Sequence, residues 1–132
     1  MAYEAGINQI ALKIAEVIHR YAESKGWSKD DYHILMKYRT DSFILNVLVV
    51  ARAFDGRSRR QEAKDYDELR HAINTGAGSE VKALNSFGLV LKGFEAYDLY
   101  WSPRLWPDEI VIDEKLINRG VSWSDPSHQV AH

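Results

Sequence analysis

Cysteine is absent from the sequence. This absence excludes disulfide bonds, thiol catalysis and every metal or iron–sulfur site that depends on thiolate ligands. The longest apolar run, from Phe43 to Ala51, is interrupted by Asn46 and is far too short for a membrane helix. The first twenty residues lack the basic region and apolar core of a signal peptide. These absences predict a cytoplasmic protein without membrane contact.

Excess positive charge is lacking as well. The 132 residues include 17 basic and 19 acidic side chains, a net charge of −2, so no global field draws the chain onto nucleic acid. Apolar residues are plentiful at 45%, which is enough for one domain to bury a core without metal or disulfides. We expect a single domain over residues 1–119 and a loosely attached C-terminal tail over residues 120–132.

Hydrophobic periodicity predicts how the first part of the chain folds. Apolar residues recur at helical spacing from Ile7 to Tyr21, and Gly26 is placed to end that helix. Two strands are expected next, over residues 32–39 and 42–51, and the short turn between them predicts a hairpin. The second of these strands is apolar on both faces, which is typical of a central strand.

A capping box at Ser58 and Gln61 predicts the start of a second helix. Its apolar stripe consists of Ala63, Tyr66, Leu69 and Ile73. Residues 80–85 fit either the start of a strand or a turn of helix, and further strands are expected at residues 89–94 and 109–113. The order helix-strand-strand-helix-strand-strand predicts an α+β fold, with two helices packed on a small mixed or antiparallel sheet of three to four strands.

One short motif lies between the second expected strand and the second helix, and it reads Phe54-Asp55-Gly56-Arg57-Ser58. It resembles the Phe-x-Gly-x-Ser turn of BolA-like domains, which run helix, strand, strand, turn, helix, strand. The resemblance covers about residues 5–92 in the order of elements and implies that fold. The family's metal-ligating histidine lies in an Arg-His-Arg run, where this chain has Glu62-Ala63-Lys64. The resemblance therefore implies no iron–sulfur ligand and no partnership with a glutaredoxin.

Four arginines surround the expected start of the second helix, namely Arg52, Arg57, Arg59 and Arg60. Guanidinium groups and free backbone N–H groups at a helix N-terminus together favour a phosphate or a carboxylate. This arginine cluster is a candidate site for an acidic protein partner or for a nucleic-acid backbone. The alternative is that these side chains are solvated or pair with Asp55, Glu62 and Asp65.

An aromatic segment forms the second candidate site, and its partner-binding residues are Tyr97, Tyr100, Trp101 and Trp106. Pro103 and Pro107 interrupt regular structure around them. Aromatic side chains in such a loop can anchor a protein interface, and the alternative is a lid over the core. Acidic side chains flank the segment and repel phosphate, so base stacking is disfavoured there.

Motifs for catalysis and for cofactor binding are missing. The sequence contains no Gly-x-Ser-x-Gly, no Walker loop and no dinucleotide fingerprint. Among the five histidines, His128 and His132 are four positions apart, but they lie in the polar tail. We therefore expect no catalytic residue, no metal and no cofactor, and we favour a protein that is not an enzyme.

Three hypotheses about function follow. The first is a non-catalytic protein-interaction domain, of an adaptor, chaperone-like or regulatory kind, whose partner is another protein or a second copy of the chain. The second is nucleic-acid binding through the arginine cluster, which the net charge disfavours. The third is a small-ligand binding protein or enzyme with a cavity between the helices and the sheet.

Overall fold

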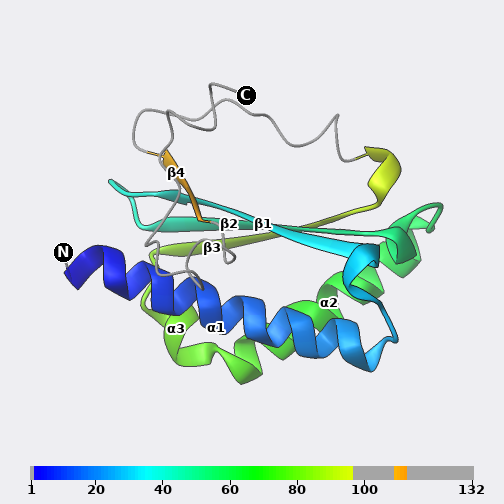
Figure 1. Ribbon diagram of the computed structural model, residues 1–132, viewed down its shortest axis with the longest axis horizontal. Coiled ribbons are helices and arrows are strands. Elements are labelled where there is room, and N and C mark those ends of the chain that lie inside the picture. The colour runs from blue at the N-terminus through cyan, green and yellow to red at the C-terminus, as the bar shows by residue number, and fades with distance from the viewer. Residues whose placement is uncertain (1, 97–108, 113–132) are drawn as a thin grey trace.

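A computed structural model describes residues 2–96 and 109–112, where three α-helices accompany a four-stranded sheet (Figure 1). The helices are α1 (Ala2–Ser24), α2 (Arg59–Gly76) and α3 (Gly78–Lys82). The strands are β1 (Tyr32–Arg39), β2 (Ile44–Ala51), β3 (Ser86–Lys92) and β4 (Glu109–Ile112). Short 3₁₀ turns cover Lys29–Asp31, Arg52–Phe54 and Phe94–Ala96. The predicted α+β fold is confirmed, with α3 as an additional short helix.

The sheet is mixed and has the strand order β3-β2-β1-β4. β1 pairs antiparallel with both β2 and β4, whereas β3 pairs parallel with β2. Parallel neighbours need a crossover connection, and α2 and α3 provide it between β2 and β3. The apolar strand β2 is flanked by strands on both sides, as its sequence predicted.

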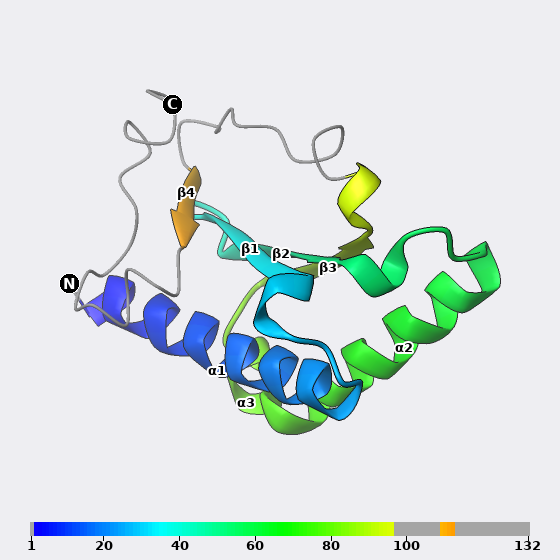
Figure 2. The same cartoon turned by 45° about the vertical axis from the view of Figure 1, so that its right-hand side comes forward.

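All three helices lie on one side of the sheet (Figures 1 and 2). The strand register places buried side chains side by side across the sheet. Met36 is opposite Val47 and Ile112, and Val47 is opposite Leu89. The helices contribute fully buried Ile14, Ile18, Leu69 and Ile73. The hydrophobic core therefore lies between the helices and the sheet. Burying each such side chain contributes about 1.5–3 kcal/mol to stability.

The hairpin turn is longer than the sequence predicted. It covers residues 40–43, so β2 begins at Ile44 rather than at Ser42. Phe43 adopts a φ of 56°, and its N–H donates to the Arg39 carbonyl at 2.9 Å. The β-forming character of Phe43 suggested a strand residue, but this backbone bond places it in the turn.

Two further segments differ from or refine the predictions. Of the two alternatives for residues 80–85, the helical one is seen in α3, and β3 begins only at Ser86. Phe94 lies in a 3₁₀ turn after β3 rather than in the strand. The predicted tail, residues 120–132, lies outside the described residues. None of the helices within residues 2–96 combines the length and apolar character needed to cross a bilayer.

The apolar stripe of α2 was predicted only in part. Leu69 and Ile73 are buried and Tyr66 packs against the core, but Ala63 is exposed. Asp65 is buried in place of Ala63, with 5% of its surface exposed. Hydrophobic periodicity could not reveal this burial, because it depends on a charged partner from outside the helix.

Candidate functional site

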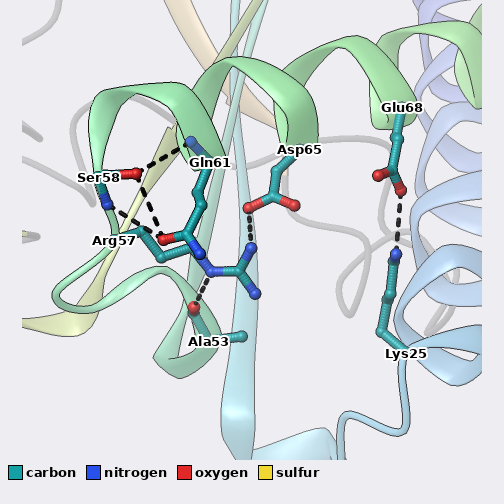
Figure 3. Close-up of polar contacts among 7 residues, drawn as sticks. All are labelled: Lys25, Ala53, Arg57, Ser58, Gln61, Asp65 and Glu68. Carbon is teal, nitrogen blue, oxygen red and sulfur yellow. Dashed lines mark hydrogen bonds and ion pairs between the residues drawn. The ribbon is translucent and has the colours of Figure 1, made fainter.

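The turn that resembles the BolA motif positions the predicted arginine cluster. Phe54 is buried and anchors the turn to the core, and Gly56 has a φ of 69°, which glycine adopts without steric strain. The Ser58 side chain accepts a hydrogen bond from the Gln61 N–H, and the Gln61 side chain accepts from the Ser58 N–H. The predicted capping box is therefore confirmed, and it fixes where α2 begins (Figure 3).

Arg57 is bound to its own fold. Its Nε donates to the Ala53 carbonyl at 2.6 Å, and its Nη1 donates to the buried carboxylate of Asp65 (Figure 3). Asp65 was one of the ion-pair partners considered from the sequence. The ion pair thus neutralises both the Arg57 charge and the buried Asp65 carboxylate within the protein.

Arg52 is partly engaged as well. Its Nε lies 3.5 Å from the Asp31 carboxylate, and its guanidinium lies 4.9 Å from the centre of the Phe94 ring. Hydrogen bonds from Ser28, together with the Arg52 charge, lower the pKa of Asp31. The ring of His33 stacks on the same Phe94. Arg52 is thus engaged by residues outside α2, unlike Arg59 and Arg60.

Arg59 and Arg60 are the remaining members of the cluster. Both lie in the first turn of α2 and are exposed. Within residues 2–96 and 109–112, neither side chain forms a hydrogen bond or an ion pair. The arginine cluster is therefore divided into two engaged side chains and two that are available to a partner.

Asp55 does not pair with the arginines. Its Oδ1 accepts a hydrogen bond from the Glu95 N–H at 3.2 Å. The backbone of Gly93 lies so close that a Cβ built there would meet the Asp55 carboxylate and lie 3.0 Å from its Cα. Asp55 thus fastens the turn before α2 to the segment after β3, a role that the sequence did not indicate.

A polar cleft of about 450 Å³ lies between the end of α1, the start of α2 and the preceding turn. Its lining comprises Tyr21, Lys25, Trp27, Ala53, Arg57, Gln61, Lys64, Asp65 and Glu68. Lys25 and Glu68 form an ion pair of 3.0 Å there, which lowers the pKa of Glu68 (Figure 3). Burial and the negative charges of Glu68 and Asp65 raise the pKa of Tyr21 to about 12.

The ion pairs in this cleft limit its chemistry. Arg57 and Lys25 are already bound to Asp65 and Glu68, so a ligand that binds either of these cations has to compete with an internal carboxylate. Over the described part of the chain, no group of three or more His, Asp and Glu residues is arranged to hold a metal ion. Two ion pairs thus occupy the cleft, one joining Lys25 after α1 to α2 and one joining the turn before α2 to the helix.

Phe43 is a surface feature that the sequence did not single out. It is the one exposed large hydrophobic residue among those the structure describes, with an exposed fraction of 45%. Its carbonyl accepts hydrogen bonds from the N–H groups of Asn85 and Ser86 at 2.9 and 3.4 Å. These bonds and the bond to Arg39 hold the left-handed backbone in place, but they do not require an aromatic side chain.

The predicted aromatic site cannot be placed in the same way. Tyr97, Tyr100, Trp101 and Trp106 all lie outside the described residues. Their assignment as partner-binding residues therefore stays a prediction.

The chain defines an α+β domain with a mixed sheet and helices on one side. Compared with protein-family models, curated proteins and solved structures, it has no match. The resemblance to BolA-like domains accordingly remains a hypothesis based on the sequence.

Proposed function

We propose that the chain is a non-catalytic protein-interaction domain that uses Phe43 as an anchor. The observation that carries this proposal is the combination of exposure and strain at one residue. A bulky side chain rarely adopts φ near 56°, because its Cβ approaches the following carbonyl oxygen, at a cost of about 1–2 kcal/mol. Glycine or asparagine satisfies the same turn with less strain.

Strain of this kind supports a functional role. Strained backbone is concentrated at binding and catalytic sites, where function rather than stability selects the residue. Large aromatic side chains are also frequent among the few residues that dominate protein interfaces. The hairpin tip presents the Phe43 ring on a rigid support, because three backbone hydrogen bonds fix the residue. A preordered anchor loses little entropy on binding.

The experiment compares three forms of the full chain as affinity baits in extracts of its natural host. Phe43→Asn removes the ring and suits the left-handed backbone, whereas Phe43→Tyr keeps the aromatic surface. We expect specific protein partners to be lost with Phe43→Asn and retained with Phe43→Tyr. Titration of each purified partner should then show at least a tenfold weaker affinity for Phe43→Asn. Equal binding by all three forms contradicts the assignment to Phe43.

Nucleic-acid binding is the second candidate function, and the two available arginines favour it. Arg59 and Arg60 present exposed guanidinium groups at the start of α2, where Lys64 is also exposed. This candidate predicts binding to single- or double-stranded probes that weakens as salt increases. Replacing both arginines with glutamine should reduce the salt dependence by about two released counterions. A nuclease treatment of the affinity baits separates the two candidates, because a direct protein partner survives it.

A further inference from the structure

The outer edge of β3 is a candidate surface for strand pairing. β3 forms one edge of the sheet, and within the described residues no strand pairs with its outer side. The opposite edge, β4, has only four residues, and a short strand is a poor template for further pairing. β3 has seven residues, contains no proline and carries a single charged side chain, Lys92, at its end. Apart from Lys92 and the Arg70 side chain, which donates to the Phe87 carbonyl, the described residues provide none of the usual devices that prevent strands from pairing with other chains.

The outward-facing backbone groups of β3 can be assigned. The Ser86 N–H is directed toward the hairpin, because it donates to the Phe43 carbonyl. The Phe87 carbonyl has the opposite direction, since it accepts a hydrogen bond from Arg70 of α2 at 3.4 Å. Backbone groups alternate along a strand, so Phe87, Leu89 and Leu91 present their N–H and C=O groups to the outer edge.

We propose that this edge pairs with the same edge of a second copy, in an antiparallel register centred on Leu89. A two-fold axis at Leu89 places Phe87 opposite Leu91 and Ser86 opposite Lys92 of the other copy. The outward N–H and C=O groups then exchange hydrogen bonds in pairs. The Phe87 carbonyl keeps its bond to Arg70, because a carbonyl oxygen accepts two hydrogen bonds.

The side chains of β3 suit a second copy in this register. Phe87 and Leu89 face the core, so their counterparts across the axis extend a continuous apolar layer beneath a widened sheet. Each Lys92 faces an uncharged Ser86, and no like charges are directly opposed. In this register the outward hydrogen-bonding groups pair, the apolar side chains are buried and no like charges of β3 are opposed. A strand from another protein would need a sequence that meets all three conditions.

Ser86 provides a matched pair of test variants because it is exposed in the monomer. Ser86→Lys places one lysine opposite Lys92 at each of the two symmetric positions, and Ser86→Glu places a negative charge opposite Lys92 there. Sedimentation over a wide range of concentration should show that Ser86→Lys weakens the dimer by roughly threefold to thirtyfold. Ser86→Glu should strengthen it, and added salt should reduce both effects.

Hydrogen exchange gives a second measurement on the unsubstituted chain. The outward N–H groups of Leu89 and Leu91 should become protected only at concentrations where the dimer forms. The inward N–H groups of Gly88 and Val90 should be protected at every concentration, because they pair with β2. A chain that stays monomeric when concentrated contradicts the proposal. So does a dimer in which the two Ser86 variants shift the affinity in the same direction, or in which Leu89 and Leu91 exchange as they do in the monomer.

The proposed dimer is independent of the proposed interaction through Phe43. Sedimentation uses the purified chain alone, so its result does not depend on any other protein. Phe43→Asn should leave the dimer affinity unchanged, because the side chain is at the hairpin tip and not on the outer edge of β3. Each proposal can thus fail without the other.

Discussion

The guanidinium of Arg57 binds the carboxylate of Asp65, whose side chain is only 8% exposed. This ion pair connects the turn before α2 to the second turn of the helix. It also explains how an acidic residue can take a buried position on a helix face.

Loss of Arg57 should destabilise the fold through Asp65. Arg57→Met leaves a buried carboxylate without its cation, and we expect the free energy of unfolding to fall by about 2 kcal/mol. This is less than for a fully buried pair, because the Arg57 side chain is 32% exposed. Urea denaturation measures the change. The double variant Arg57→Met with Asp65→Asn should recover part of the loss, and equal instability of both variants would contradict a role for the buried charge.

Two glycines should respond in opposite ways to alanine. A Cβ at Gly93 meets the Asp55 backbone, so Gly93→Ala should lower the free energy of unfolding by about 1–3 kcal/mol. A Cβ at Gly78 meets nothing within 4 Å, and Gly78→Ala should raise it by about 0.4–1 kcal/mol. Thermal unfolding of both variants tests the comparison. A stable Gly93→Ala protein would show that the Asp55 turn can move away from the segment after β3.

Phe43→Asn should leave the protein nearly as stable as the unsubstituted chain. Relief of about 1–2 kcal/mol of backbone strain offsets the contacts that a half-exposed ring loses. The free energy of unfolding should therefore change by less than about 1 kcal/mol, compared with about 3–5 kcal/mol for truncating a buried phenylalanine. A large loss of stability on urea denaturation would mean that Phe43 serves the fold and not a partner.

Tyr21 should make stability depend on pH in alkaline solution. Its pKa is raised from 10.0 to about 12, so folding favours the neutral hydroxyl. This contribution is fully present below pH 10 and is lost as the pH rises toward 12. Tyr21→Phe should remove that part of the alkaline destabilisation, as followed by thermal unfolding at increasing pH. Absorbance of tyrosinate should show one titrating group fewer with a midpoint near pH 12. An unchanged profile would place the Tyr21 hydroxyl in a more polar environment.

Sequence patterns were sufficient where local chemistry decides the structure. The bounds of β1, the capping box at Ser58 and the interior position of β2 all follow from periodicity and turn chemistry. The turn conformation of Phe43 is held by a hydrogen bond to Arg39 and by bonds from Asn85 and Ser86. The latter two are distant in the sequence, so local propensity could not reveal them.

The arginine cluster was predictable only in part. The arginines could be located at the start of α2, but which of them are available could not be determined. That division depends on Asp31 and Asp65, which reach Arg52 and Arg57 only in the folded chain. Charge spacing alone does not distinguish a bound guanidinium from an available one.

The parallel pairing of β2 with β3 also determines the order in which the chain can assemble. β1 and β2 are joined by a short turn, whereas β3 reaches β2 only after α2 and α3 have brought the chain back across the sheet. Closing the longer loop costs more conformational entropy, so we expect the hairpin to form before β3 joins it. During synthesis, the apolar strand β2 is exposed along one edge until β3 emerges. An unpaired strand edge is a template for other chains, so we expect the nascent chain to be prone to aggregate during that interval.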